Sequence, residues 1–367
     1  MSRRTIGEVN VRPAIQSLDA YHPGQRTAGS VKLSSNENPR GCSPAVRDAV
    51  SKVMEDVHFY PDGAAQALRS AIAVQEGVAV EQIIVGNGSD EILTILAGTY
   101  LDPGDSVLIG AHTFSQYRFS ATLFGATVVT VPMPELVMRP GDFLARIQED
   151  TKVVFLCSPN NPTGSTISQD ELTSFLAAVP KDLLVVVDHA YIEYQEDLTA
   201  CNAVPLISAY PNLVVLRTFS KIYGLANLRI GYGMAQASRI AEMSRVRSPF
   251  NVGGISQEAA RVALHDREFV ASTLKMNRQT KEMLEIACTD LHLPWTPSQG
   301  NFVMIGLPEP LPDASQVAAA LAAQGFTVRG LASFGLPRHL RISLGTEDQM
   351  KRFIPVFRSV IQQLRHP

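Results

Sequence analysis

The stretch LVVLRTFSK (residues 213–221) joins an apolar, β-branched run to a lysine through a short polar segment. Residues 213–216 read as a buried strand, because near-continuous apolar runs are typical of parallel strands covered by helices on both faces. Thr218 and Ser220 precede Lys221. Alone, Lys221 fits a helix-start lysine whose ammonium reaches water. It also fits a partly desolvated amine that is nucleophilic at neutral pH. The neighbouring segments decide between the two.

The same arrangement occurs four more times towards the N-terminus. Strands are expected at residues 82–85, 106–109, 153–156 and 183–187, and the five strands lead into GNGSDE, GAHTF, CSPNNPTG, DHAY and RTFSK. Short β-branched runs that alternate with longer helical patterns predict crossover units and a parallel sheet. Ligands of such sheets bind at the carboxyl edge of the strands. The polar segments therefore predict one composite site.

The pattern changes near RSPFNVGGIS (residues 247–256), where proline and glycine interrupt it. Beyond this point strands are expected at residues 301–306, 326–329 and 340–345. Helices are expected at residues 314–324 and from residue 347 to the end. This part of the chain is predicted to be a smaller α+β domain.

Composition excludes several classes of protein. The 367 residues suffice for two domains, and a net charge of −3 argues against a surface for nucleic acid. Apolar runs such as Leu183–Val187 are too short to span a membrane, and MSRRTIGEVN lacks the apolar stretch of a signal peptide. Four scattered cysteines show no paired metal spacing. We expect a cytoplasmic protein with neither a metal site nor a membrane contact.

Asp188 directly follows the apolar run LLVVV, where a carboxylate needs a partner. One such partner is the protonated ring nitrogen of a pyridine cofactor, which an aspartate makes a better electron sink. Tyr191, three residues on, would place a phenol near the same ring. The alternatives are a helix-capping aspartate and a metal ligand, but no cluster of metal-ligand spacing surrounds Asp188.

Two further motifs are typical of an anion site. In GNGSDE, Ser89 and Asp90 look like a helix start whose backbone N–H groups hold a phosphate. A dinucleotide fingerprint, and with it a nicotinamide dehydrogenase, would need a third glycine where Glu91 stands. Arg229 can bind two phosphate oxygens, although a surface or interdomain ion pair is the plainer alternative. In SPNNPTG, Asn161 can donate to an anionic ring oxygen or simply belong to a turn.

Together these motifs are similar to those of fold-type I pyridoxal-phosphate-dependent aminotransferases, and most closely to the histidinol-phosphate aminotransferase group. The resemblance also includes SSNENPRG (34–41), FYPDG (59–63), SPFNV (248–252) and LRISLG (340–345). It implies an α/β, aspartate-aminotransferase-like fold with a mostly parallel sheet. The implied parts are an N-terminal segment (1–35) near the substrate site, a large cofactor-binding domain (36–250) and a small C-terminal domain (251–367).

The resemblance implies a role for each matched residue. Lys221 would form an imine with the cofactor aldehyde, and Asp188 would pair with the pyridine nitrogen. The ring oxygen would be held by Tyr191 and Asn161. The phosphate would be held by Ser89, Asp90, Thr218, Ser220 and Arg229, with Tyr60 from the neighbouring subunit of a homodimer. Phe114 would stack on the ring, with Tyr117 as the alternative at this position. Substrate would meet Arg341, Arg329, Asn36 and Tyr21.

The implied activity is transamination between histidinol phosphate and 2-oxoglutarate, giving imidazole acetol phosphate and glutamate in histidine biosynthesis. Arg341 matches the arginine that binds the anionic group of the substrate in this family. Arg329 matches a second arginine, which helps to bind the phosphate of histidinol phosphate. Both would otherwise be surface residues of a small-domain sheet. An aromatic amino-acid aminotransferase would not need Arg329, and a phospho-amino-acid decarboxylase shares the scaffold. A non-catalytic binding protein is disfavoured by the combination of Lys221, Asp188 and Asn161.

Overall fold

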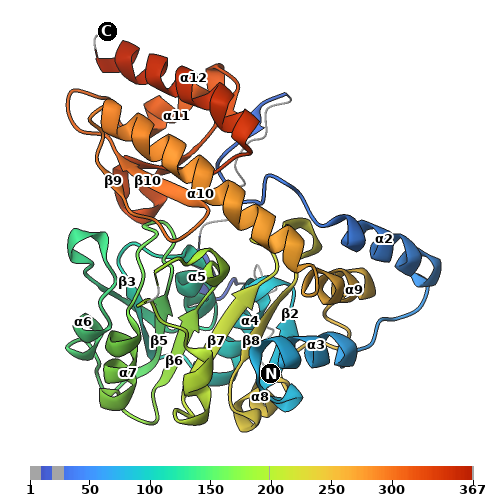
Figure 1. The fold of residues 1–367 in the computed structure, drawn as a ribbon. Helices are drawn as coiled ribbons and strands as arrows, with labels where there is room; N and C mark the ends of the chain where they lie inside the picture. The colour runs from blue at the N-terminus through green and yellow to red at the C-terminus, as the bar shows by residue number, and fades with distance from the viewer. Residues whose placement is uncertain (1–9, 19–28, 198, 366–367) are drawn as a thin grey trace, which may run out of the picture.

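The computed structural model describes residues 10–18, 29–197 and 199–365. Figure 1 shows a larger α/β part beneath a smaller part, with the long helix α10 (Arg267–Asp290) running from one to the other. Each part has its own apolar core, one around the large sheet and one around the small sheet. In the described ranges, no helix is long and apolar enough to cross a membrane.

A seven-stranded sheet in the order β2-β8-β7-β6-β5-β3-β4 forms the centre of the large part. Its strands are β2 (Ile83–Gly86), β3 (Ser106–Gly110), β4 (Thr127–Val131), β5 (Thr151–Cys157), β6 (Leu184–Asp188), β7 (Leu213–Thr218) and β8 (Gly231–Met234). All neighbours pair in parallel except β8, which is antiparallel to both β7 and β2. The prediction of a mostly parallel sheet is confirmed.

The five strands expected in this sheet are present, with ends shifted by one or two residues, and two further strands of the sheet, β4 and β8, were not predicted. The edge strand β4 buries only Val131 fully, so its sequence lacks the continuous apolar run of the central strands. The sequence of β8 is GYGM, and its two glycines give a weak strand signal. Gly231 lies where the backbones of α4 and β7 approach closely, and Gly233 lies against the side chains of Ile84, Ile92 and Leu216. Packing rather than propensity therefore forms this strand.

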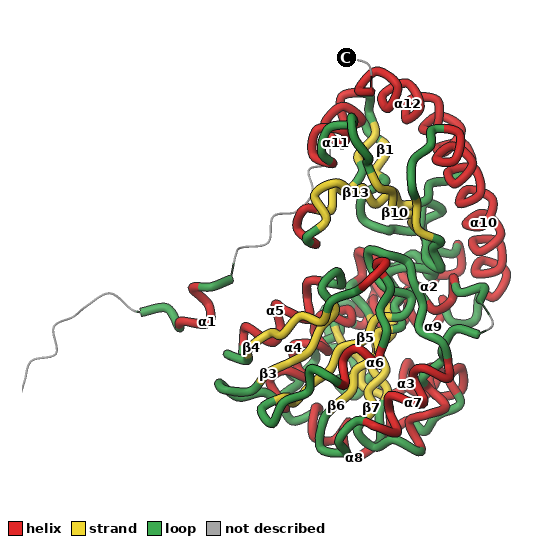
Figure 2. Tube along the Cα trace, turned by 90° about the vertical axis from the view of Figure 1, so that its left-hand side faces the viewer, coloured by secondary structure: helices red, strands yellow, loops and turns green. Residues whose placement is uncertain are grey.

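Helices flank both faces of the large sheet (Figures 1 and 2). The α-helices of this part are α2 (Pro44–Val53), α3 (Gln66–Glu76), α4 (Gly88–Tyr100), α5 (Ser115–Leu123), α6 (Pro140–Leu144), α7 (Gln169–Ala178), α8 (Ala237–Met243) and α9 (Gly254–Ala263), and the short α1 covers Pro13–Gln16. The 3-10 helices are η1 (Met54–Asp56), η2 (Val80–Gln82), η3 (Pro134–Leu136), η4 (Ile192–Tyr194), η5 (Val204–Ser208), η6 (Ala226–Leu228) and, in the small part, η7 (Ala332–Phe334).

The small part is an antiparallel sheet in the order β12-β13-β10-β9, covered by helices. Its elements are β9 (Trp295–Thr296), β10 (Phe302–Gly306), β12 (Arg329–Leu331), β13 (Leu336–Ser343), α11 (Ala314–Ala323) and α12 (Glu347–Arg365). The strand expected at 326–329 is divided into β11 (Phe326–Thr327) and β12. The reason is that β11 leaves this sheet to pair with β1 (Val31–Lys32). The strand expected at 340–345 begins earlier, at Leu336.

The boundary expected at residues 250/251 falls before α9. Buried Ala259, Ala260 and Ala263 of α9 belong to the core of the large part. Leu284 and Cys288, near the end of α10, belong to the core of the small part. The two cores therefore meet along α10.

Residues 31–42, which we call the linking segment, tie the small part to the large one. Val31 pairs with Phe326, and the Ser343 N–H donates to the Leu33 carbonyl oxygen at 2.9 Å. Further along, Asn38 Nδ2 donates to the carbonyl oxygen of Ile222 at 2.8 Å, one residue after Lys221. The segment thus fixes the loop that carries Lys221 against the small sheet.

Gly224 is where the linking segment approaches the Lys221 loop most closely. Its φ is +70°, and an added Cβ would lie 1.9 Å from the Gly41 carbonyl oxygen. Gly77 also has φ +70°, but nothing lies within 4 Å of its added Cβ. We expect Gly77→Ala to cost about 1 kcal/mol of unfolding free energy from the backbone conformation alone. Gly224→Ala should cost at least about 2 kcal/mol more, from the clash. Chemical denaturation of both variants measures the difference, and equal losses would contradict it.

Candidate functional site

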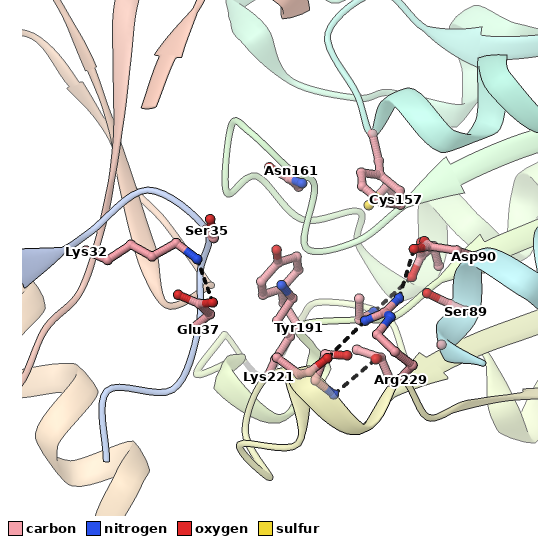
Figure 3. Close-up of a pocket in the computed structure, with 17 residues that line it drawn as sticks. Lys32, Ser35, Glu37, Ser89, Asp90, Cys157, Asn161, Tyr191, Lys221 and Arg229 are labelled. Atoms are coloured by element: carbon pink, nitrogen blue, oxygen red, sulfur yellow. Dashed lines mark hydrogen bonds and ion pairs between the residues drawn. The ribbon is translucent and has the colours of Figure 1, made fainter. Parts of the chain in front are cut away.

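One cavity lies at the carboxyl ends of five strands that run in the same direction, and the segments that follow these strands line it (Figure 3). The five strands are β2, β3, β5, β6 and β7. This inner cavity has a volume of about 320 Å³. It adjoins an outer cavity of about 480 Å³ that extends towards the small part. Both are lined by Ser35, Asp90, Phe114, Asn161, Tyr191, Lys221 and Arg229.

Lys221 lies three residues beyond β7 and lines both cavities. Its Nζ is 5.5 Å from the centroid of the Tyr191 ring. In Figure 3 the two side chains lie together in the middle of the site, between the linking segment and the N-terminus of α4. The amine is therefore placed where it can reach a ligand in either cavity.

Asp188 is the last residue of β6 and is 2 % exposed. Its Oδ2 accepts a hydrogen bond from the Tyr117 hydroxyl at 2.7 Å, and Oδ1 accepts one from the Ala190 N–H at 3.0 Å. Burial raises the pKa of Asp188 to about 6, while the hydrogen bonds from Tyr117 and Ala190 act in the opposite direction. A carboxylate that lines a cavity at this depth is suited to a cationic ligand group.

The N-terminus of α4 forms the anion-binding end of the inner cavity. The first N–H groups of a helix have no intrahelical acceptor, so those of Ser89 and Asp90 are available to a ligand. The side chain of Asn87 turns away and donates to the Asn251 carbonyl oxygen. Close packing keeps this end narrow, since a Cβ on Gly231 would lie 2.6 Å from the Ser89 nitrogen.

Three side chains complete this end of the cavity. Thr218 and Ser220 are buried, and their hydroxyl-bearing side chains line the cavity. Arg229 has a left-handed φ of +47°, and its Nη2 lies 3.0 Å from Asp90 Oδ2. Both partners of this ion pair are roughly half-exposed, so it contributes little stability in itself. The pair instead holds a guanidinium beside the helix N-terminus.

The turn SPNNPTG divides its two asparagines between structure and site. Asn160 is fully buried; its Nδ2 donates to the His112 carbonyl oxygen at 2.9 Å, and its Oδ1 accepts from the Thr113 hydroxyl at 2.7 Å. Asn161 faces both cavities. The first amide fixes the loop so that the second is presented to a ligand.

Arg341 joins the outer cavity to the large part. Its Nη1 donates to Asn161 Oδ1 at 2.5 Å and its Nη2 to the Ser34 carbonyl oxygen at 2.7 Å. Burial lowers the pKa of Arg341 to about 10, so the guanidinium stays charged at neutral pH. Asn36 Nδ2 donates to the Tyr191 hydroxyl at 2.9 Å. The linking segment therefore contacts both an arginine and a phenol of the site.

The structure brings together most of the residues that the sequence pointed to. The inner cavity is lined by Ser89, Asp90, Phe114, Asn161, Asp188, Tyr191, Thr218, Ser220, Lys221 and Arg229, and the outer cavity also by Asn36, Arg329 and Arg341. Phe114 faces the cavity, whereas Tyr117 lies fully buried behind Asp188. Tyr60 is 83 % exposed outside both cavities and stacks on Phe250. Tyr21 lies outside the described residues.

Several lining residues were not identified from the sequence, and three of them have ionisable side chains. Lys32 and Glu37 form a 2.7 Å ion pair at the wall of the inner cavity (Figure 3). Their spacing carries no motif, and only the course of the linking segment places them there. Cys157 also lines the cavity, as the last residue of β5. Its place at the carboxyl end of a predicted strand was the available signal.

Burial of Asp188 should lower the free energy of unfolding of the ligand-free protein, although it places a carboxylate where a ligand can bind. The pKa of Asp188 rises from 3.8 in the unfolded chain to about 6 in the folded protein. The free energy of unfolding is therefore reduced by the full cost of burying the charge above about pH 6, and is not reduced below the ordinary pKa of aspartate. We expect Asp188→Asn to raise the unfolding free energy of the ligand-free protein by about 2–3 kcal/mol at about pH 8. The gain should vanish at about pH 4.

Chemical denaturation across this pH range measures the effect. Asp62→Asn is the matched control of opposite sign, because backbone hydrogen bonds from Gln66 and Ala64 lower the pKa of Asp62. That variant should lose stability above the ordinary pKa of aspartate. A pH-independent effect of Asp188→Asn would contradict the account.

Comparison with known proteins assigns the family. Residues 28–357 match the family model described as aminotransferase class I and II. Histidinol-phosphate aminotransferase from Brevibacillus brevis is 42% identical over 331 residues, covering 90% of each chain. The enzyme of that name from Geobacillus sp. (strain WCH70) is 38% identical over 97% of this chain and 99% of its own. The structure of histidinol-phosphate aminotransferase from Sinorhizobium meliloti in complex with pyridoxal-5'-phosphate has a TM-score of 0.88 at 26% identity, covering 96% of this chain and 97% of that one. The chain described here belongs to the class I and II aminotransferases.

Proposed function

We propose that this chain is a pyridoxal-phosphate-dependent transaminase whose amino donor is histidinol phosphate, with 2-oxoglutarate as the acceptor for the released amino group. The proposal draws on the names of its relatives, which are 36–42% identical to it. The observation that carries it is a pair of arginines, Arg329 and Arg341, at the outer cavity beyond Lys221. A cytoplasmic location is proposed with it, as expected for an enzyme of amino-acid biosynthesis.

The inner cavity fits the proposed cofactor in four places. At one end the N-terminus of α4, Thr218, Ser220 and Arg229 would hold the phosphate. A Cβ on Gly88 would lie 2.6 Å from Arg229 Nη2, so glycine is needed for the guanidinium to reach this end. Asp188 would accept a hydrogen bond from the ring nitrogen, and Asn161 and Tyr191 would bind the ring oxygen. Phe114 would cover the ring face.

When bound, pyridoxal phosphate supplies an aldehyde for the amino group and a ring that accepts electrons from the substrate Cα. Lys221 Nζ would accept the proton from the Cα of the amino donor in the first half-reaction. In the second half-reaction it would donate a proton to the Cα of the acceptor. Asp188 would hold the proton on the ring nitrogen, and the Tyr191 hydroxyl would donate to the ring oxygen. Asn36 restrains that hydroxyl from the linking segment.

Two adjacent arginines favour a substrate with a phosphate group. Arg329 and Arg341 are paired across β12 and β13, and both line the outer cavity. A phosphate dianion accepts several charge-assisted hydrogen bonds, and two guanidinium groups supply them. Arg341 alone would suffice for the single carboxylate of an aromatic amino acid. The second arginine therefore supports a phosphorylated donor.

Comparing amino donors on wild type and Arg329→Ala tests this assignment. We expect kcat/KM for histidinol phosphate to fall by about a hundredfold, because one charge-assisted contact to phosphate is lost. The value for phenylalanine should change by less than about threefold. Arg338→Ala is the matched control on β13: its Nη1 pairs with Glu309 and its Nε donates to the Leu307 carbonyl oxygen. That control should affect both donors equally.

Lys221→Ala serves as the inactive reference for the donor comparison. Equal losses for both donors in Arg329→Ala would remove the support for a phosphorylated substrate. Release of carbon dioxide from a phosphorylated amino acid, without a keto product, would instead favour a decarboxylase.

We also propose that the chain acts as a homodimer in which Tyr60 reaches the phosphate of the neighbouring subunit. Support comes from the exposure of Tyr60 and its neighbours Met54, Val57 and Phe59, an unusual group of large apolar side chains on a surface. Stacking on Phe250 at 4.8 Å holds the Tyr60 ring outwards.

Subunit mixing tests this arrangement. Lys221→Ala and Tyr60→Ala subunits, each impaired alone, should regain activity when mixed dimers form. One of the two sites then combines Lys221 of one subunit with Tyr60 of the other. Absence of recovery, with mixed dimers verified by sedimentation and tag capture, would contradict a shared site.

A further inference from the structure

Tyr117 is buried behind the inner cavity and contacts its most deeply buried charge. It lies in the first turn of α5, three residues after Phe114, and its side chain is fully buried. Its hydroxyl donates to Asp188 Oδ2 at 2.7 Å. The ring stacks on Phe155 with centroids 5.0 Å apart and an interplanar angle of 5°, and meets Phe114 edge-on at 5.7 Å. Two aromatic contacts thus fix a single hydrogen bond.

The hydroxyl is one of few groups that can stabilise a negative charge on Asp188. The Ala190 N–H donates to Oδ1, and the Lys221 amine acts favourably from further away. Asp90 has the opposite effect, although Arg229 offsets part of its charge. Cys157 adds no charge, because burial raises the pKa of its thiol to about 12. Tyr117 therefore supplies the one side-chain hydrogen bond that the described residues make to the Asp188 carboxylate.

The tyrosine can only donate in this position. Burial, with the Asp188 charge beside it, raises the pKa of the Tyr117 hydroxyl well above its usual range. The phenol consequently keeps its proton at any working pH, and the direction of the hydrogen bond is fixed. Charge-assisted hydrogen bonds of this kind are about twice as strong as neutral ones.

We propose that Tyr117 is a positioning residue that keeps Asp188 an oriented carboxylate anion, ready to pair with a protonated ring nitrogen. This inference rests on the proposed function, since it assigns Tyr117 a role towards the cofactor of that reaction. Phe114 and Tyr117, one helical turn apart, then have separate tasks: the first covers the ring face and the second acts through Asp188 at the ring nitrogen.

Tyr117→Phe tests the proposal, because it removes only the hydroxyl and keeps both ring contacts. The measurement is the dissociation constant of pyridoxal phosphate from the apoprotein between about pH 5 and pH 9, where Asp188 titrates. Affinity in wild type should fall as the pH drops through the range in which Asp188 gains its proton. In Tyr117→Phe the midpoint should move up by about one pH unit, an affinity loss of about twofold at about pH 7 that approaches tenfold at about pH 5. The KM for the amino donor should hold while kcat falls.

Tyr232→Phe is the matched control. Tyr232 is equally buried, and its hydroxyl donates to a carboxylate, Glu76 Oε1, at the same 2.7 Å. Loss of that bond should lower thermal stability without moving the pH midpoint. A second probe is 1-deazapyridoxal phosphate, which carries carbon in place of the ring nitrogen. Its affinity should be the same for wild type and Tyr117→Phe.

The outcomes separate this inference from the proposed function. If wild type binds pyridoxal phosphate and transaminates, but Tyr117→Phe keeps the wild-type midpoint, the tyrosine is only structural and the inference is wrong. If wild type itself neither binds the cofactor nor transaminates, both fall. Should Tyr117→Phe fail to fold, site-specific 3-fluorotyrosine at position 117 keeps the size and strengthens the donor. The midpoint should then move down, and an unchanged or raised midpoint overturns the inference.

Discussion

A parallel sheet brings the carboxyl ends of its strands to one edge, and the whole site depends on that constraint. The ends of β2, β3, β5, β6 and β7 supply the segments that line the cavity. Between them β8 runs antiparallel, and its Gly231 allows the backbone of α4 to approach. The result is a narrow anion-binding end next to a buried carboxylate. Neither would form if the strands ended at different edges.

The cavity combines costly elements that a stable core would avoid. Asp188 is charged and almost fully buried at the inner cavity, and Arg341 is buried at the adjoining outer cavity. Each retains its charge because neighbouring groups are aimed at it: Tyr117 and Ala190 at the carboxylate, Asn161 and Ser34 at the guanidinium. Burial of this kind strengthens electrostatic interactions with a ligand, since water is excluded from both charges. The loss in stability and the gain in binding have the same physical origin.

The linking segment connects the two parts of the molecule through the site itself. Its start pairs with the small sheet, and its middle contacts Tyr191 and the Ile222 carbonyl oxygen. Arg341 reaches back to the same segment from β13. A substrate in the outer cavity would therefore touch the small sheet, the linking segment and the Lys221 loop at once. Its binding energy depends on how these three are placed.

The sequence alone determined the parallel sheet and most of the residues that line the cavity, because apolar runs that end in polar segments indicate both. The cofactor class followed from the resemblance of the motifs to those of a known family. Family comparison confirms the aminotransferase resemblance. Residue roles such as those of Asn36 and Arg329 stay predictions. Local patterns did not reveal β8 or the start of β13, since glycine-rich and irregular strands depend on their neighbours. Only the tertiary structure decided that Phe114 faces the cavity while Tyr117 lies behind Asp188. Both aromatics are one helical turn apart, and the packing of α5 against the sheet selects which one is exposed to a ligand.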